Sequence, residues 1–215
     1  MANPAFDVRR MTREEFHRLD EEGFFPPDKR VELINGVVYE MPTQDSWHAS
    51  TIQAAQEELR QVFVDGCHLR NQMPLALDLC SEPVPDLAIV TGHWRDYRSA
   101  HPTTAVLVVE VSASSVRFDR EEKRLLYATA GLPEYWILYV KTKQLEVMRE
   151  PQDGDYRSRV ILKPGDTVTP LAAPSASIRV ADLLPDHPNG SRSSYSRDNA
   201  TARTRSASGN VCSPG

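Results

Sequence analysis

The sequence predicts a mixed α/β fold in which helices cover the faces of a central β-sheet. Apolar residues at helical spacing alternate along the chain with short runs rich in β-branched residues, and turn-forming residues separate them. One such run, residues 105–111, is apolar almost throughout, as expected of a central strand covered on both faces. A composition of 40% hydrophobic and 26% charged residues is that of an ordinary globular protein.

Capping signals and periodicity predict the helices. The expected helices cover residues 12–23, 46–63 and 119–130. Thr12 and Glu15 form a capping box at the start of the first. Asp119 and Glu122 form a similar pair, so we expect Asp119 to lie at the beginning of the third helix.

The expected strands alternate with these helices. They cover residues 30–34, 37–41, 68–73, 75–79, 86–90, 105–111, 135–140, 144–150 and 156–162. Asn35-Gly36 predicts a tight hairpin between the first two, since both residues adopt the positive φ of a type I′ turn. The pattern indicates a mixed sheet with helices on its faces.

The chain divides into a folded part and a tail. Residues 1–185 suffice for one α/β domain with a single core. Residues 186–215 are rich in Ser, Arg, Asn and Thr, with Tyr195 as their one aromatic residue, so we expect this tail to be disordered. No apolar run approaches the length of about 20 residues that crosses a membrane, and no secretory signal is visible. We therefore expect a cytoplasmic protein with no membrane partner.

Composition argues against some kinds of site. Cys67, Cys80 and Cys212 are odd in number and lack CxxC spacing, which argues against a disulfide framework or a thiolate zinc site. The net charge of −5 does not indicate nucleic-acid binding. An acidic protein can still bind DNA if basic groups line one cleft and carboxylates hold a divalent cation.

Two carboxylates carry the main chemical signal. Asp86 opens one expected strand, and Glu110 ends the apolar run. A carboxylate on a central strand must be solvated, paired or bound to a metal, because burying a lone charge is costly. If the two strands are neighbours, both groups reach one point and could share a divalent cation, with Mg²⁺ or Mn²⁺ favoured by oxygen ligands. The alternative is that Asp86 caps a turn and Glu110 faces solvent.

Lys123 is the third candidate. On the expected helix it shares a face with Leu126 and Tyr127, the face that packs on the sheet. We therefore expect its ammonium to emerge at the sheet edge where Glu110 ends, where it could polarise a phosphate oxygen. The alternative is a lysine that merely extends from a helix face into solvent.

These residues occur in an order that resembles a known family. The matching segments are Glu32-Leu-Ile-Asn-Gly36, His48, Pro85-Asp86, Val109-Glu110-Val-Ser112, Lys123 with Tyr127, Gly131 and Pro133-Glu-Tyr-Trp136. The set is similar to the Uma-two family of restriction endonucleases, within the PD-(D/E)XK nuclease superfamily. The resemblance covers residues 11–184 and implies a restriction-endonuclease-like core, a mixed central β-sheet flanked by helices, and metal-dependent cleavage of phosphodiester bonds.

The resemblance also implies roles for individual residues. Asp86 and Glu110 would bind Mg²⁺, with Mn²⁺ as a substitute, and the backbone carbonyl of Val111 would join them. Lys123 would be the catalytic lysine, placed on the helix. The superfamily's usual position for that lysine, two residues after Glu110, is Ser112 in this chain.

Glu32 and His48 match further family positions, which implies supporting roles. Glu32 would contact the metal through water, and His48 would touch phosphate or transfer a proton near neutral pH. The alternatives are an exposed strand carboxylate for Glu32 and an ordinary first-turn helix residue for His48.

Three arginines suggest a DNA-facing strip. Arg95, Arg98 and Arg117 each have an aromatic residue as a near neighbour in the sequence. Because basic and aromatic residues are often mixed on protein surfaces, a solvated loop is the competing interpretation.

Two functions from different classes follow. The first is a metal-dependent DNA endonuclease, for which a homodimer is expected because two-fold sites serve the cutting of two strands. The second is a catalytically silent nuclease fold that acts as a nucleic-acid-binding or interaction module. A non-nucleolytic enzyme on the same scaffold is a third alternative.

Overall fold

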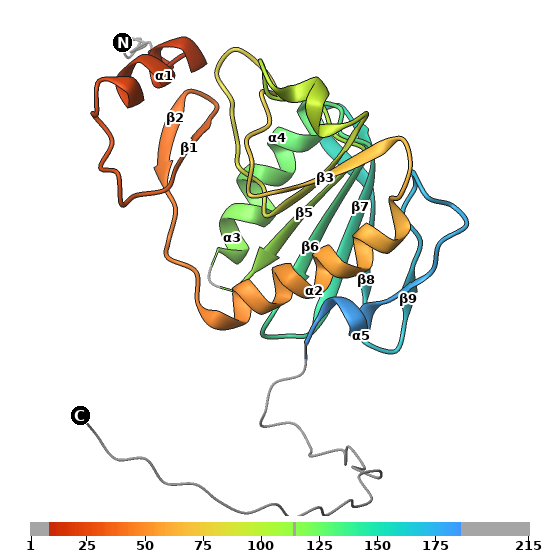
Figure 1. Ribbon diagram of the computed structural model, residues 1–215. Helices are drawn as coiled ribbons and strands as arrows, with labels where there is room; N and C mark the ends of the chain where they lie inside the picture. Colours follow the sequence, from red (N-terminus) through yellow and green to blue (C-terminus); the bar gives the residue numbers. More distant parts are fainter. Residues whose placement is uncertain (1–8, 114, 186–215) are drawn as a thin grey trace, which may run out of the picture. The chain divides into compact units, whose positions relative to one another are not determined.

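A six-stranded sheet lies at the centre of the structure, a computed structural model that describes residues 9–113 and 115–185 (Figure 1). In spatial order the strands are β3 (Cys67–Asn71), β4 (Leu87–Thr91), β5 (Leu107–Ser112), β6 (Glu134–Tyr139), β7 (Gln144–Gln152) and β8 (Asp155–Leu162). β5 and β6 are parallel and the other neighbouring pairs are antiparallel, so the sheet is mixed, as predicted. The predicted tail, 186–215, lies outside the described residues.

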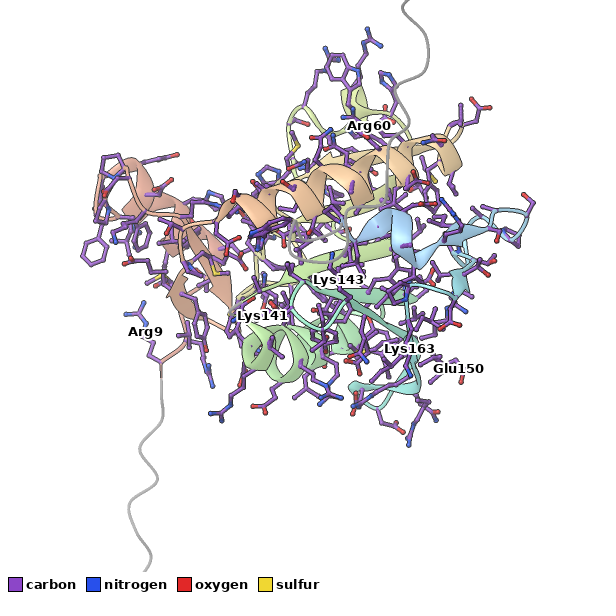
Figure 2. All side chains as sticks on the ribbon, turned by 90° about the horizontal axis from the view of Figure 1, so that it is seen from below. Arg9, Arg60, Lys141, Lys143, Glu150 and Lys163 are labelled. Carbon is purple, nitrogen blue, oxygen red and sulfur yellow. The ribbon has the colours of Figure 1, made fainter. Side chains whose placement is uncertain are left out.

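Helices cover both faces of this sheet (Figure 2). α2 (Ser46–Val62) and α5 (Val180–Leu183) contribute to the apolar core on one face. A continuous helical segment covers the other face and consists of α3 (Val116–Phe118), η2 (Asp119–Lys123) and α4 (Arg124–Thr129). Every residue of β5 and β6 is buried between the two cores, which explains why these strands are so apolar.

The N-terminal elements stand beside the sheet (Figure 1). α1 (Arg13–Glu21) begins with the predicted capping box at Thr12. β1 (Val31–Ile34) and β2 (Val37–Glu40) form the predicted hairpin, in which Asn35 has φ 50° and Gly36 φ 74°. A Cβ at Gly36 would also lie 2.4 Å from the Cβ of Arg10, so the space requires glycine there as well.

The remaining regular elements are short. They are η1 (Trp94–Tyr97) after β4, and β9 (Thr167–Val168) and β10 (Ile178–Arg179), which pair with each other before α5. Among the described residues, none of the helices combines the length and apolarity that crossing a membrane requires.

Two local predictions are wrong. Residues 75–79 form no strand, because their amides bond to scattered loop carbonyls: that of Leu75 bonds to Pro83 and that of Ala76 to Pro102. The third helical segment begins at Val116 rather than at Asp119, three residues earlier than predicted. Asp119 is therefore no cap but a buried residue inside the segment.

Candidate active site

The topology brings Asp86 and Glu110 side by side. β4 begins immediately after Asp86 and pairs with β5, so that Leu87 lies opposite Val109. Alternation along β5 turns Val108 and Glu110 towards the α4 face of the sheet. The amide of Asp86 lies 3.4 Å from Glu110 Oε2, and the amide of Val111 donates to Asp86 Oδ2 at 2.8 Å. Both carboxylates are buried, so neither merely faces solvent.

Lys123 reaches the same point from η2. Its Nζ lies 2.9 Å from Glu110 Oε1 and 3.1 Å from Glu32 Oε2. The side chain is 1% exposed, so the ammonium does not emerge at the sheet edge as expected but is enclosed between two carboxylates. The hydroxyl of Tyr127, one turn further along in α4, donates to the same Glu110 oxygen at 2.8 Å. Lysine and tyrosine together hold Glu110 in place.

Glu32 and His48 also belong to this cluster. Glu32 is 2% exposed in β1 and shares Lys123 with Glu110, so it is not an exposed strand carboxylate. His48 lies in the first turn of α2, and its Nε2 is 3.2 Å from Asp86 Oδ1. Gln72 donates to that oxygen at the same distance. Side chains from the β1–β2 hairpin, from α2 and from η2 thus meet at Asp86 and Glu110.

Asp119 is the residue that the sequence interpretation missed. It is 2% exposed and accepts a hydrogen bond from the Ser115 hydroxyl at 2.5 Å. It begins η2, a π-helical turn in which the amide of Arg124 bonds to the Asp119 carbonyl five residues back. Eight residues of regular α-helix would set Asp119 and Tyr127 about 80° apart, and the extra residue of a π turn rotates them back towards one face.

These side chains line a small cavity that we call the carboxylate pocket. Its polar lining includes Glu32, His48, Asp86, Glu110, Asp119 and Lys123. The cavity measures about 50 Å³, room for a few water-sized particles. With Asp45 and Arg30, which also line it, the pocket holds five carboxylates against one lysine, one arginine and one histidine, so negative charge is in excess.

This excess is visible in the pKa values. Burial and then the charges of neighbouring carboxylates raise the pKa of Glu110 to about 8, although Lys123 acts against them. Burial raises the pKa of Asp119, which Lys123 offsets only in part. Burial lowers the pKa of Lys123, but attraction by Glu110 and Glu32 outweighs it and holds this pKa above its usual range. Lys123 therefore stays protonated and cannot act as a base near neutral pH.

Asp86 differs from the other pocket carboxylates. Burial raises its pKa, but the hydrogen bond and charge of His48 and the Val111 amide together hold it below the usual value. Asp86 thus remains ionised where Glu110 is readily protonated. Two neighbouring carboxyl groups with different proton affinities suit a cation site, because a bound cation displaces the remaining proton.

The donor set fits a hard divalent cation. Mg²⁺ prefers carboxylate and carbonyl oxygens and keeps several of its waters. Within residues 9–113 and 115–185, no group of three or more His, Cys, Asp and Glu side chains is arranged to hold a metal ion. An ion shared by the neighbouring Asp86 and Glu110 would therefore take its remaining ligands from the backbone and water.

The three arginines do not form one strip. Arg95 and Arg98 follow the C-terminal end of β4, whereas Asp86 precedes its N-terminal end. They therefore lie at the opposite end of that strand from the carboxylate pocket. Arg117 is close to the pocket in the chain, two residues after Ser115, but pairs with Glu121 at 2.9 Å.

Comparison with known proteins identifies the fold first. The crystal structure described as "a putative nuclease belonging to DUF820 from Anabaena variabilis ATCC 29413" matches this chain with a TM-score of 0.61 and 16% sequence identity. The match covers 77% of this chain and 96% of that chain, so the two share the fold of a nuclease. No curated protein matches the sequence.

The family follows from the sequence. Residues 13–181 match the model of the Uma2 family, described as "Putative restriction endonuclease". This chain belongs to that family. The fold and the family support a nuclease function.

Proposed function

We propose that this chain is a metal-dependent DNA endonuclease whose active site is the carboxylate pocket. The observation that carries the proposal is the Asp86–Glu110 pair, which meets across two strands beside Lys123 in a pocket with excess negative charge. The family and the fold support nucleic acid as the substrate. We assign residues 1–185 to the nuclease domain and 186–215 to a tail, and we expect a cytoplasmic protein.

The ion would be held from the sheet side of the pocket. Asp86, Glu110 and the Val111 carbonyl are the proposed ligands of Mg²⁺, with Mn²⁺ as a substitute. When bound, such a cation lowers the pKa of water and neutralises charge on the scissile phosphate. The reaction joins a water oxygen to phosphorus and breaks a phosphorus–oxygen ester bond, leaving a phosphomonoester and a hydroxyl.

The surrounding side chains prepare these ligands. Lys123 and Tyr127 hold Glu110 Oε1, which leaves Oε2 on the side of Asp86. Because Lys123 remains protonated, it contributes in two ways. Its positive charge stabilises the negative charge that develops on the phosphate, and its ion pair holds Glu110 in position. His48 Nε2 contacts Asp86 and helps to hold it, and Glu32 shares the charge of Lys123.

A second candidate function is a nucleic-acid-binding module without turnover. The ion pairs of Lys123 favour this candidate. Its ammonium is almost fully buried and lies within salt-bridge distance of both Glu110 and Glu32, so it is already neutralised within the fold. The acidic net charge of −5 points the same way. In this alternative the polar cluster stabilises the fold, and the pocket binds no catalytic ion.

Plasmid cleavage with Mg²⁺ or Mn²⁺ tests the two candidates. We expect Asp86→Asn and Glu110→Gln to lose at least about 10²-fold of the cleavage rate, as typical of losing one electrostatic contact in a site. Glu122→Gln is the matched control, because Glu122 is exposed on the same helical segment as Lys123 and does not line the pocket. Metal binding by wild-type protein without cleavage of any DNA or RNA would favour the binding module.

A further inference from the structure

Asp119 has no role in the mechanism described so far, although it lines the carboxylate pocket. The π turn places it one helical turn before Lys123, facing the sheet. We infer that Asp119 is a further residue of the cation site, which acts by holding a cation-bound water rather than the ion itself. This inference rests on the proposed function, because it assumes that Asp86 and Glu110 bind the ion.

First, no cationic side chain in the described part of the chain contacts Asp119 directly, although the charge of Lys123 partly offsets its own. Glu32 and Glu110 contact the Lys123 ammonium, and Asp86 contacts His48. Asp119 forms no ion pair with any residue in the described part of the chain, and its side chain accepts one hydrogen bond, from Ser115. A buried carboxylate is normally paired or directed at a metal, because an isolated buried charge is very costly.

The second argument comes from a neighbouring hydroxyl. Ser112 follows Glu110 by two residues in β5 and is 1% exposed. Its Oγ forms no hydrogen bond of good geometry among the described residues, and its looser hydrogen-bonding contact with Asp119 lowers the pKa of that carboxyl. A buried, unsatisfied hydroxyl beside a buried carboxylate marks a place where a water or ion would complete the hydrogen bonding.

The third argument explains why the contact would pass through water. No described group of three or more acidic, His or Cys side chains is close enough to hold one ion directly. Mg²⁺ retains several waters in proteins, and the cavity of about 50 Å³ has room for them. Residues that hold such outer ligands typically contribute 10- to 100-fold to metal affinity.

The test is calorimetric titration of the full chain with MgCl₂ and with MnCl₂, without DNA. We expect Asp119→Asn, which keeps the shape and removes the charge, to weaken binding about 10- to 100-fold. Glu122→Gln removes the same charge from an exposed position of the same helical segment, and we expect its affinity to stay within about twofold of wild type.

A second variant guards against a folding defect. Ser115→Ala removes the hydroxyl that holds Asp119, and we expect it to weaken binding by about two- to tenfold, the effect of one hydrogen bond. Wild-type affinity in Asp119→Asn, or equal losses in Asp119→Asn and Glu122→Gln, would overturn the inference. Failure of the wild type itself to bind either metal would instead remove the cation site, and the proposed function with it.

Discussion

At the residue scale, the carboxylates of the pocket repel one another, and one buried cationic side chain, Lys123, lies among them. Lys123 lies between Glu110 and Glu32, and Asp86 and Asp119 add two further charges nearby. Two unit charges about 4 Å apart interact by roughly 4 kcal/mol at an effective dielectric near 20. Lys123 therefore matters to the stability of the fold, and a divalent cation would relieve the repulsion that remains.

Lys123→Ala is expected to destabilise the metal-free protein. Removing one partner of a buried ion pair typically costs about 3–5 kcal/mol, because the remaining charges stay buried and unpaired. For a protein of this size that lowers Tm by on the order of 10 °C in a thermal melt. Lys141→Ala is the control: Lys141 is exposed in the turn after β6 (Figure 2) and has no ion pair among the described residues. Equal Tm values for the two variants would show that the Lys123 ion pairs contribute no net stability.

The contribution of Glu110 to the stability of the metal-free protein should fall as pH rises from about 5 to 8. The pKa of Glu110 is raised to about 8 in the folded state, so the folded protein binds a proton that the unfolded chain has lost. Stability from this group is complete below its ordinary pKa and is lost as pH rises through 8. Burial raises the pKa values of Glu32 and Asp119 in the same direction, whereas that of Asp86 is lowered and acts at more acidic pH.

Thermal melts across this pH range measure the effect directly. We expect Tm to drop by on the order of 5 °C for wild type and by much less for Glu110→Gln, which cannot titrate. Mg²⁺ should flatten the dependence, because the bound ion requires ionised Glu110. An equal change of Tm with pH in wild type and in Glu110→Gln would contradict the description of the pocket.

At the element scale, the first helix cap and the hairpin turn can be predicted from neighbouring residues. The backbone partners of a segment cannot, because they depend on distant parts of the chain. The capping box at Thr12 and the Asn35-Gly36 turn are decided by neighbouring residues, and both predictions are confirmed. Residues 75–79 resemble a strand because leucine recurs at every second position, although Leu75 is buried and Leu79 is exposed. Their backbone partners lie in loops, however, which local patterns do not reveal.

The site shows the same limit. The helical face that carries Lys123 is readable from its spacing to Tyr127, but its burial depends on Glu32, which comes from a hairpin 91 residues away. Asp119 precedes the predicted helix as a cap would. Only the π turn, for which the sequence carries no recognised signal, places its side chain inside the pocket. An acidic residue four positions before a candidate lysine is the one clue that could have suggested it.

Glu134 provides a test at the other end of β6. Its Oε1 accepts hydrogen bonds from Trp136 at 2.9 Å and from two nitrogens of Arg149 at 2.6 and 2.9 Å, and its Oε2 accepts one from the Leu171 amide at 2.8 Å. Glu134→Ala leaves these donors unsatisfied, and we expect a loss of about 3–5 kcal/mol in urea unfolding.

The same variant should leave metal affinity unchanged. Glu134 begins β6, whereas the residues of β5 that border the pocket, Glu110 and Val111, pair with the later residues Ile137 and Leu138. A variant that folds but binds Mg²⁺ tenfold more weakly would show that the two ends of the sheet are coupled, against our expectation.

At the scale of the whole molecule, the sequence divides into a domain expected to fold and a tail expected not to. We predict that deleting residues 186–215 changes Tm by no more than about 2 °C, because a tail with so few large apolar residues is expected to contribute no core contacts. The tail carries four arginines against two aspartates. Its removal should therefore weaken DNA binding modestly at low salt, as measured by fluorescence anisotropy. A large fall in Tm would show that part of the tail packs on the domain.

The central claim is that Asp86 and Glu110 share one divalent cation. Crystals of the protein soaked in MnCl₂ test it directly, because anomalous scattering identifies the ion and locates it. We predict one strong anomalous peak in the carboxylate pocket, within about 2.0–2.6 Å of a carboxylate oxygen of each residue. The peak should be absent from crystals of Glu110→Gln soaked in the same way. A pocket without an anomalous peak in the wild type, or a peak that contacts neither carboxylate, would contradict the account.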